Sequence, residues 1–167
     1  MKKFIGILIV GLFLVLPLQV FAVGTVVQTL ATTCGSDPQG VPCQKVLTLV
    51  CTADSAAATY PSTAISAANM EQLKGWFLFT GSALNGAAGP TASSVIKLST
   101  ATQGDILGGA GKTPTVATSA AESKFLPIGD TVYLTPKAIP VVGDLTFAIT
   151  GNAVNSAVVT VVLTFIK

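Results

Sequence analysis

Short runs of β-branched residues alternate with turn residues along most of this 167-residue chain. The last run, residues 157–166, consists almost entirely of Val, Thr, Leu, Phe and Ile, and it follows the turn dipeptide Gly151-Asn152. Such side chains favour strands, and the Gly, Asn, Asp and Pro residues between the runs favour turns. No amphipathic helical pattern of useful length is found. The chain is therefore predicted to be all-β.

The predicted architecture is a single β-sandwich, jelly-roll or immunoglobulin-like, with about seven to eight short strands. The expected strands are Thr25–Ala31, Lys45–Thr52, Lys74–Thr80, Val95–Ser99, Thr131–Thr135, Asp144–Thr150 and Ala157–Ile166. Residues 53–69 are expected to form a loop, followed by a short helical turn at Asn69–Leu73. The strand that holds Trp76, Phe77 and Phe79 is the best candidate for the core.

A cleaved signal peptide is predicted ahead of this domain. Two Lys residues precede an apolar run from Phe4 to Leu16, Pro17 interrupts the run, and Val-Phe-Ala ends at Ala22. This order is typical of an export signal cleaved after Ala22, which places the all-β domain at residues 23–167. The protein is then secreted, periplasmic or at the cell surface. The alternative is an uncleaved segment that holds the protein in the membrane, because the apolar run is almost long enough to span a bilayer.

The charged residues exclude several functions. The chain has nine basic residues, all Lys, seven acidic residues and no His. Histidine-based catalysis and His-ligated zinc are therefore excluded, as is an arginine fork for phosphate. Loss of Lys2 and Lys3 with the signal leaves seven Lys against seven acids. A neutral chain is a poor nucleic-acid ligand and tends to associate, so we expect no nucleic-acid partner and a homo-oligomer or larger assembly.

The three cysteines, Cys34, Cys43 and Cys51, form an odd set in an oxidising compartment. A Cys34–Cys43 disulfide is favoured, because the turn-rich segment between them can close a hairpin-like loop. Cys51 shares its strand parity with Leu47 and Leu49 and is expected to point inward as a small hydrophobe. The competing interpretation is an exposed thiol that links copies of the chain.

The apolar final run gives two alternatives for its strand. A central strand is favoured, and pairing with another copy is the alternative. On that alternative, the candidate interface residues are Cys51, Val158, Val159, Val161, Val162 and Phe165. The Gly-rich middle, residues 81–127, is the least strand-like part and is the expected place for a recognition loop.

Several short motifs are interpreted as structural. Gly108–Thr113 ends like a phosphate-binding loop, but Ile106 stands where the first Gly belongs and Pro114 follows. Ser94 and Lys97 have the Ser-x-x-Lys spacing of penicillin-recognising enzymes, but in a strand they would point to opposite faces.

Acidic and aromatic residues offer further candidates. Asp105, Asp130 and Asp144 each follow Gly, and Gly-Asp is an ordinary turn dipeptide. A turn role is therefore favoured over calcium binding or a pair of carboxylates for hydrolysis. Trp76 is expected in the core and not at a sugar site. No catalytic, metal or cofactor residue is predicted.

The second half of the chain resembles small all-β proteins encoded among the structural genes of tailed phages and prophages. The motifs that carry the resemblance are Gly89-Pro90-Thr91, Gly104-Asp105-Ile106-Leu107-Gly108-Gly109-Ala110-Gly111, Gly143-Asp144-Leu145-Thr146-Phe147-Ala148-Ile149-Thr150-Gly151-Asn152 and Val154-Asn155-Ser156-Ala157. The resemblance covers roughly residues 75–167. It implies a virion component, such as a decoration or accessory protein, without catalytic residues. The predicted signal peptide is a departure from this resemblance, because virion proteins assemble in the cytoplasm.

The sequence therefore favours a secreted, non-enzymatic structural protein that associates with itself or with a larger assembly. The alternative is a secreted module that binds carbohydrate or a cell-surface ligand through residues 81–127. An exposed aromatic residue in that segment is the feature that would distinguish this alternative, and the presence of Phe125 as the only aromatic residue there counts against it.

Overall fold

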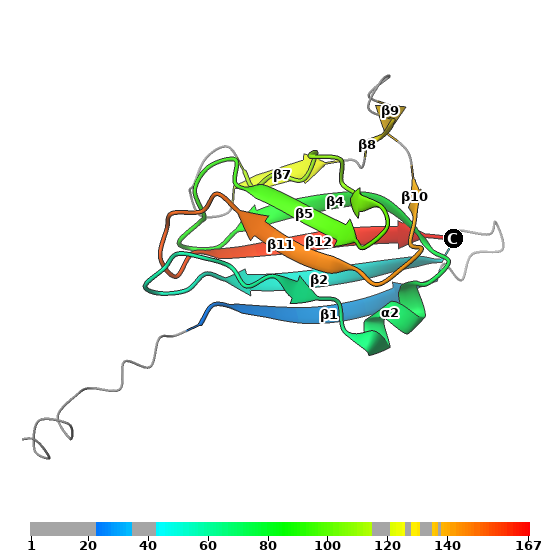
Figure 1. The fold of residues 1–167 in the computed structure, drawn as a ribbon, viewed down its shortest axis with the longest axis horizontal. Coiled ribbons are helices and arrows are strands. Elements are labelled where there is room, and N and C mark those ends of the chain that lie inside the picture. Colours follow the sequence, from blue (N-terminus) through cyan, green and yellow to red (C-terminus); the bar gives the residue numbers. More distant parts are fainter. Residues whose placement is uncertain (1–22, 35–42, 115–120, 126–127, 131–134, 137) are drawn as a thin grey trace, which may run out of the picture.

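The computed structural model describes residues 23–34, 43–114, 121–125, 128–130, 135–136 and 138–167. It forms two antiparallel sheets that pack face to face, so the expected all-β sandwich is confirmed (Figure 1). In chain order the elements are β1 Thr25–Thr33, β2 Gln44–Thr52, β3 Thr63–Ala64, α2 Ala67–Leu73, β4 Phe77–Asn85, β5 Val95–Thr100, β6 Gly104–Asp105, β7 Glu122–Phe125, β8 Ile128–Asp130, β9 Thr135–Pro136, β10 Ile139–Pro140, β11 Thr146–Thr150 and β12 Val158–Ile166. The predicted signal peptide lies outside the described residues.

The larger sheet has six strands in the order β1-β2-β12-β4-β10, and β7 pairs with β4 beside β10. The smaller sheet has the order β3-β11-β5-β6, and β8 pairs with β9 separately. β12 lies between β2 and β4 and pairs with both in antiparallel register, from Val158↔Thr52 to Ile166↔Gln44 on one side. The final run is thus a central strand, as the sequence favoured.

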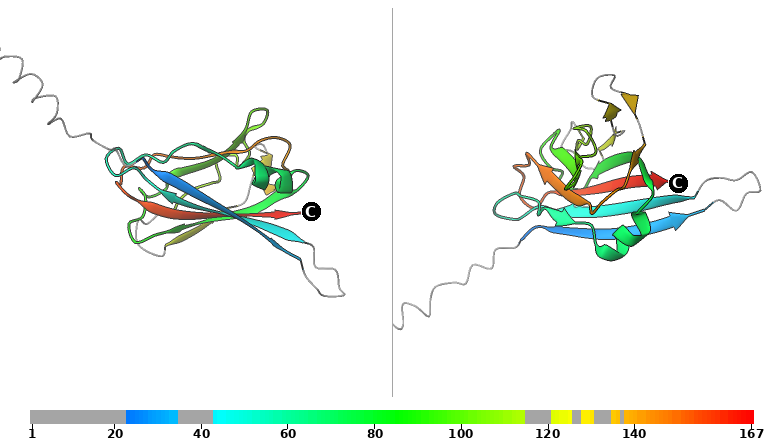
Figure 2. Two further views of the ribbon diagram at one scale, coloured as in Figure 1. Left: turned by 90° about the horizontal axis from the view of Figure 1, so that it is seen from below. Right: turned by 45° about the vertical axis from the view of Figure 1, so that its right-hand side comes forward.

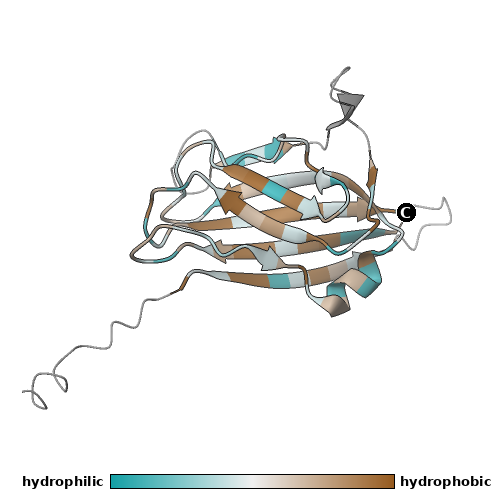
Figure 3. Cartoon of the chain, in the orientation of Figure 1, coloured by the Kyte–Doolittle hydropathy of each residue, from teal (hydrophilic) through white to brown (hydrophobic). Residues whose placement is uncertain are grey.

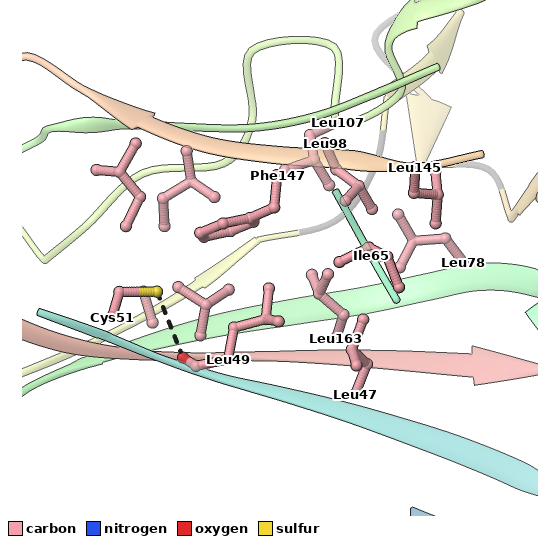
Figure 4. Close-up of a cluster of buried hydrophobic side chains, with 14 of the residues drawn as sticks. Leu47, Leu49, Cys51, Ile65, Leu78, Leu98, Leu107, Leu145, Phe147 and Leu163 are labelled. Carbon is pink, nitrogen blue, oxygen red and sulfur yellow. Dashed lines mark hydrogen bonds between the residues drawn. The ribbon is translucent and has the colours of Figure 1, made fainter. Parts of the chain in front are cut away.

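Strict alternation along the strands builds the core. Leu47, Leu49 and Cys51 of β2 point inward. Every second residue of β12, from Val159 to Phe165, points inward as well. They meet Phe147 and other apolar side chains of the smaller sheet, as Figure 4 shows. Because neighbouring residues of a strand face opposite sides, the same alternation places the other half of each strand on the outer face.

The cysteine predictions are confirmed. Cys34 and Cys43 form a disulfide, with Cα atoms 4.1 Å apart. The β1–β2 register ends at Thr33↔Gln44, so the disulfide joins the next pair of the same hairpin. Cys51 is free and fully buried.

The region predicted as loop is more ordered than expected. Residues 53–69 contain β3 and the start of α2. Ser66 caps this helix by accepting a hydrogen bond from the Asn69 amide. The expected helical turn is therefore confirmed, with an earlier start at Ala67.

The aromatic strand is displaced relative to its prediction. β4 starts at Phe77 and continues to Asn85, into the segment expected to be a recognition loop. The β4–β12 register shifts between Thr164 and Phe165, which leaves Phe79 as an extra, bulged residue. Trp76 is buried as predicted, and Leu78 is buried with it, but Phe77 and Phe79 are 41% and 49% exposed, so only part of this strand contributes to the core.

The middle of the chain also differs from its prediction. Residues 81–127 supply half of β4 and all of β5, β6 and β7, so this segment builds both sheets instead of forming a long loop. The expected strand Thr131–Thr135 lies almost entirely outside the described residues.

Candidate functional surface

The outer face of the larger sheet is the most unusual surface of the described molecule. It is formed by the outward-facing residues of four neighbouring strands, and cross-strand partners identify them. These residues are Thr25, Val27, Thr29, Ala31 and Thr33 of β1; Gln44, Val46, Thr48, Val50 and Thr52 of β2; Val158, Thr160, Val162, Thr164 and Ile166 of β12; and Phe77, Thr80, Ser82 and Leu84 of β4. We call this set the outer face. None of its residues is charged.

Large apolar side chains reach solvent on this face. Val27 is 59% exposed, Leu84 43%, Phe77 41% and Val50 40%. Along the strands of an antiparallel sheet, apolar residues that face the core normally alternate with polar residues that face solvent. Here both sides of β12 are β-branched or apolar, and Figure 3 shows this strand in brown and pale colours along its length.

Charged residues begin only beyond the outer face. Glu122 and Lys124 of β7 pair with Leu84 and Ser82, so they lie on the same side of the sheet at its β4 border. The smaller sheet presents a charge within its own outer surface, because Lys97 of β5 is exposed between the buried Ile96 and Leu98. The two outer surfaces of the sandwich therefore differ in charge.

One Lys of the larger sheet is kept inside. Lys45 of β2 points inward and is only 9% exposed. Its Nζ donates to the carbonyl of Gln72 at 2.6 Å and lies 4.7 Å from the ring centroid of Trp76. The last carbonyls of a helix and an aromatic face both stabilise a cation. Lys45 thus ties the end of α2 to the sandwich and adds no charge to the outer face.

The interface residues predicted from the sequence are mostly unavailable. Cys51, Val159, Val161 and Phe165 are fully buried, which contradicts their assignment to an interface. Burial also raises the pKa of the Cys51 thiol to about 12, so the interpretation as an exposed linking thiol is wrong. Both edges of β12 are occupied by β2 and β4, which rules out pairing of this strand with another copy.

Val158 and Val162 are the two predicted interface residues that point outward. They are half-buried and belong to the outer face. The interface prediction from the sequence thus fell mostly on the inner side of β12. Val27, Val50 and Leu84 were missed. A signal for Val27 and Val50 was present, because the predicted strands Thr25–Ala31 and Lys45–Thr52 contain Lys45 as their only charged residue, whereas Leu84 lies outside every predicted strand.

The motif residues lie in structural positions. Ser94 is buried and donates through Oγ to the carbonyl of Thr91 at 2.7 Å, whereas Lys97 points to solvent. The two residues thus face opposite sides, as predicted. In the glycine segment, an added Cβ at Gly111 would lie 2.5 Å from the carbonyl oxygen of Ile96, so this chain passes closely under β5. No helix follows it within the described residues.

The three aspartates do not assemble. Asp105 accepts hydrogen bonds from the amides of Leu98, Leu107 and Gly109 at 3.1–3.2 Å, which makes it a loop brace. Asp144 is exposed, and nothing is described for the side chain of Asp130. The described residues contain no cluster of three or more His, Cys, Asp or Glu with metal-binding geometry.

A shallow pocket of about 260 Å³ lies at one end of the sandwich, beside Tyr60 and Asn152. The polar groups of Tyr60 and Asn152 already have partners within the protein. The Tyr60 hydroxyl donates to the carbonyl of Ala157. Burial is the main cause that raises the pKa of Tyr60, and the nearby Cys51 raises it further. The Asn152 amide donates to the carbonyl of Ala58 and its oxygen accepts from the amide of Thr91. These bonds tie three loops together.

Comparisons with protein-family models, with curated proteins and with solved structures found no match to this chain. Among the described residues, no helix has the length and apolar character needed to cross a membrane. The disulfide fits an oxidising compartment outside the cytosol. The function is therefore argued from the outer face.

Proposed function

We propose that this chain is an exported, non-enzymatic structural protein that works by associating with copies of itself through the outer face. The observation that carries the proposal is the lack of any charged residue across β1, β2, β12 and β4 on their solvent side. Contiguous exposed apolar patches on soluble proteins mark interaction sites. The face is broad and has a fixed hydrogen-bonded framework, so two such faces can meet without ordering new backbone.

Charge supports a second copy as the partner. Without residues 1–22, seven Lys balance seven acids, so copies do not repel one another over long distances. A partner with a charged surface would lose hydration against the outer face without gaining a counter-charge. Export is part of the proposal and rests on residues 1–22 and the disulfide. An accessory role in a virion or on a cell surface, which the sequence resemblance implies, is a particular case of it.

The binding-module alternative has less support. Its aromatic residue, Phe125, is only 6% exposed because its ring packs over Gly81 of β4. A sugar needs an accessible aromatic face for stacking, and Phe125 does not offer one. Phe77 and Phe79 are exposed, but they lie in β4 at the border of the outer face, outside the segment 81–127 to which the alternative assigns binding.

Light scattering on a sizing column tests the proposal with residues 23–167 over a range of protein concentrations. We expect an assembly whose mass rises with concentration. Lys substitutions at Val50 and Leu84 together should reduce that mass, because association would then bury unpaired charges. Thr146→Lys, exposed on the smaller sheet, is the matched control and should leave the mass unchanged. A monomer at all concentrations, or equal assembly by the V50K/L84K variant with native circular dichroism, would refute the proposal.

A further inference from the structure

The strand β1 forms one edge of the larger sheet. It is nine residues long and, within the described part of the chain, pairs only with β2. In the left-hand view of Figure 2, β1 crosses in front of the other strands of its sheet, and α2 lies to one side of it, where Gln28 contacts Ser66 and Asn69. A strand in this position presents a row of backbone groups to any second strand that approaches.

The hydrogen-bond alternation identifies those backbone groups. The Ala53 amide donates to the Ala157 carbonyl at 2.8 Å, so residues of β2 with odd numbers direct their backbone groups toward β12. Residues of β2 with even numbers therefore bond to β1, where they face Thr25, Val27, Thr29, Ala31 and Thr33. The alternate residues of β1, Val26, Gln28, Leu30 and Thr32, then direct their N–H and C=O groups to the free edge.

The strand itself lacks the charges, prolines and bulges that often prevent strand pairing. Thr25–Thr33 contains no charged residue and no Pro, and its register with β2 runs without a bulge. The Gln28 side chain does not cover the edge, because it is bound on the inner side: its Nε2 donates to the carbonyl of Ala64 and its Oε1 accepts from the amide of Ser66.

We propose that a second copy of this chain pairs with β1 through its own β1, antiparallel, with the two-fold axis at Thr29. This register places Val26 opposite Thr32 and Gln28 opposite Leu30, and it uses every outward backbone group of both strands. One sheet then runs continuously through both copies and joins their outer faces. The inference rests on the proposed self-association and adds a second contact to it, because pairing at the β1 edge extends the outer face across two copies.

Cysteine crosslinking tests the contact and its register. Thr29 lies on the axis in a non-hydrogen-bonded pair, where Cα atoms are about 4.5 Å apart, within the range for a disulfide. Under mild oxidation, T29C should form a linked dimer at least about tenfold faster than V27C, because paired strands hold the two thiols together. V27C alone should not link, since Val27 faces Ala31 of the second copy, whereas the V27C/A31C variant should. T146C is the control for random collision.

The outcomes separate this inference from the proposed function. If light scattering shows an assembly but T29C links no faster than T146C, the copies meet elsewhere, and the β1 pairing is wrong while the proposed function stands. Equal linking by V27C and T29C would overturn the proposed register. A monomer by light scattering, with no linking by any variant, would overturn both.

Discussion

Gly81 shows how a single residue determines a local packing arrangement. It lies opposite Phe125 in the β4–β7 pair, and a Cβ at this position would collide with the Phe125 ring. We expect Gly81→Ala to destabilise the fold by about 1–3 kcal/mol, because the ring has to leave a buried site. Chemical denaturation monitored by Trp76 fluorescence measures the change.

Two further variants make this prediction specific. Gly143→Ala is the matched control, since nothing lies within 4 Å of a Cβ added there and no positive φ is recorded for it. Its effect should be within about 0.5 kcal/mol. In the background of Phe125→Leu, Gly81→Ala should cost less than in the wild type. Equal costs in both backgrounds would mean that the ring is not the cause.

Asp54 carries a pH-dependent contribution to stability. Its Oδ1 accepts hydrogen bonds from the amides of Ala57 at 2.6 Å and Ala56 at 2.7 Å, and these bonds lower the pKa of the carboxyl. A lowered folded-state pKa means that the unfolded chain binds the proton more tightly. The stabilisation is therefore present above the ordinary Asp pKa of about 3.9 and is lost as the pH falls through the lower folded value.

The Tm of Asp54→Asn tests this contribution. We expect the variant to melt below the wild type at pH 7 and the two Tm values to converge as the pH falls below about 4. Asp144→Asn, at an exposed site, controls for the loss of one negative charge. A Tm difference that stays constant with pH would show that the carboxylate charge is not responsible.

At the scale of secondary-structure elements, the sequence predicts the strands that contain long β-branched runs. Both ends of β1, β2, β5, β11 and β12 are found within two residues of their predicted bounds. These runs carry their own signal because almost every residue in them favours a strand. The Cys34–Cys43 pair follows from the same signal, since it closes the hairpin between two such runs.

The elements that were missed depend on tertiary contacts. The second half of β4, Gly81–Asn85, begins and ends with turn-forming residues, yet it is held between β12 and β7. Gly81 is needed there as the seat of the Phe125 ring. β7, Glu122–Phe125, has one buried residue and pairs only with the edge of β4. Neither segment has a local pattern strong enough to be identified before its partner is known.

The candidate surface was predicted only in part, for a similar reason. The sequence indicates a chain with little charge and an apolar final strand. It does not show which side of that strand faces solvent, because both sides of β12 are apolar or β-branched. The burial of Val159 and Val161, and the exposure of Val27 and Val50 on neighbouring strands, follow from the pairing of the two sheets.

For the whole molecule, the absence of charge on the outer face predicts how association responds to salt. Attraction between charged surfaces weakens as the Debye length falls from about 30 Å at 0.01 M salt to about 3 Å at 1 M. Burial of apolar surface does not weaken in this way. We expect the mass of the wild-type assembly, measured by light scattering, to stay constant or rise across this range. V50K/L84K should regain part of its lost association at high salt, as the added charges are screened. A wild-type assembly that dissociates with salt would instead place ion pairs between copies, and Glu122 and Lys124 at the border of the face would then be the first residues to substitute.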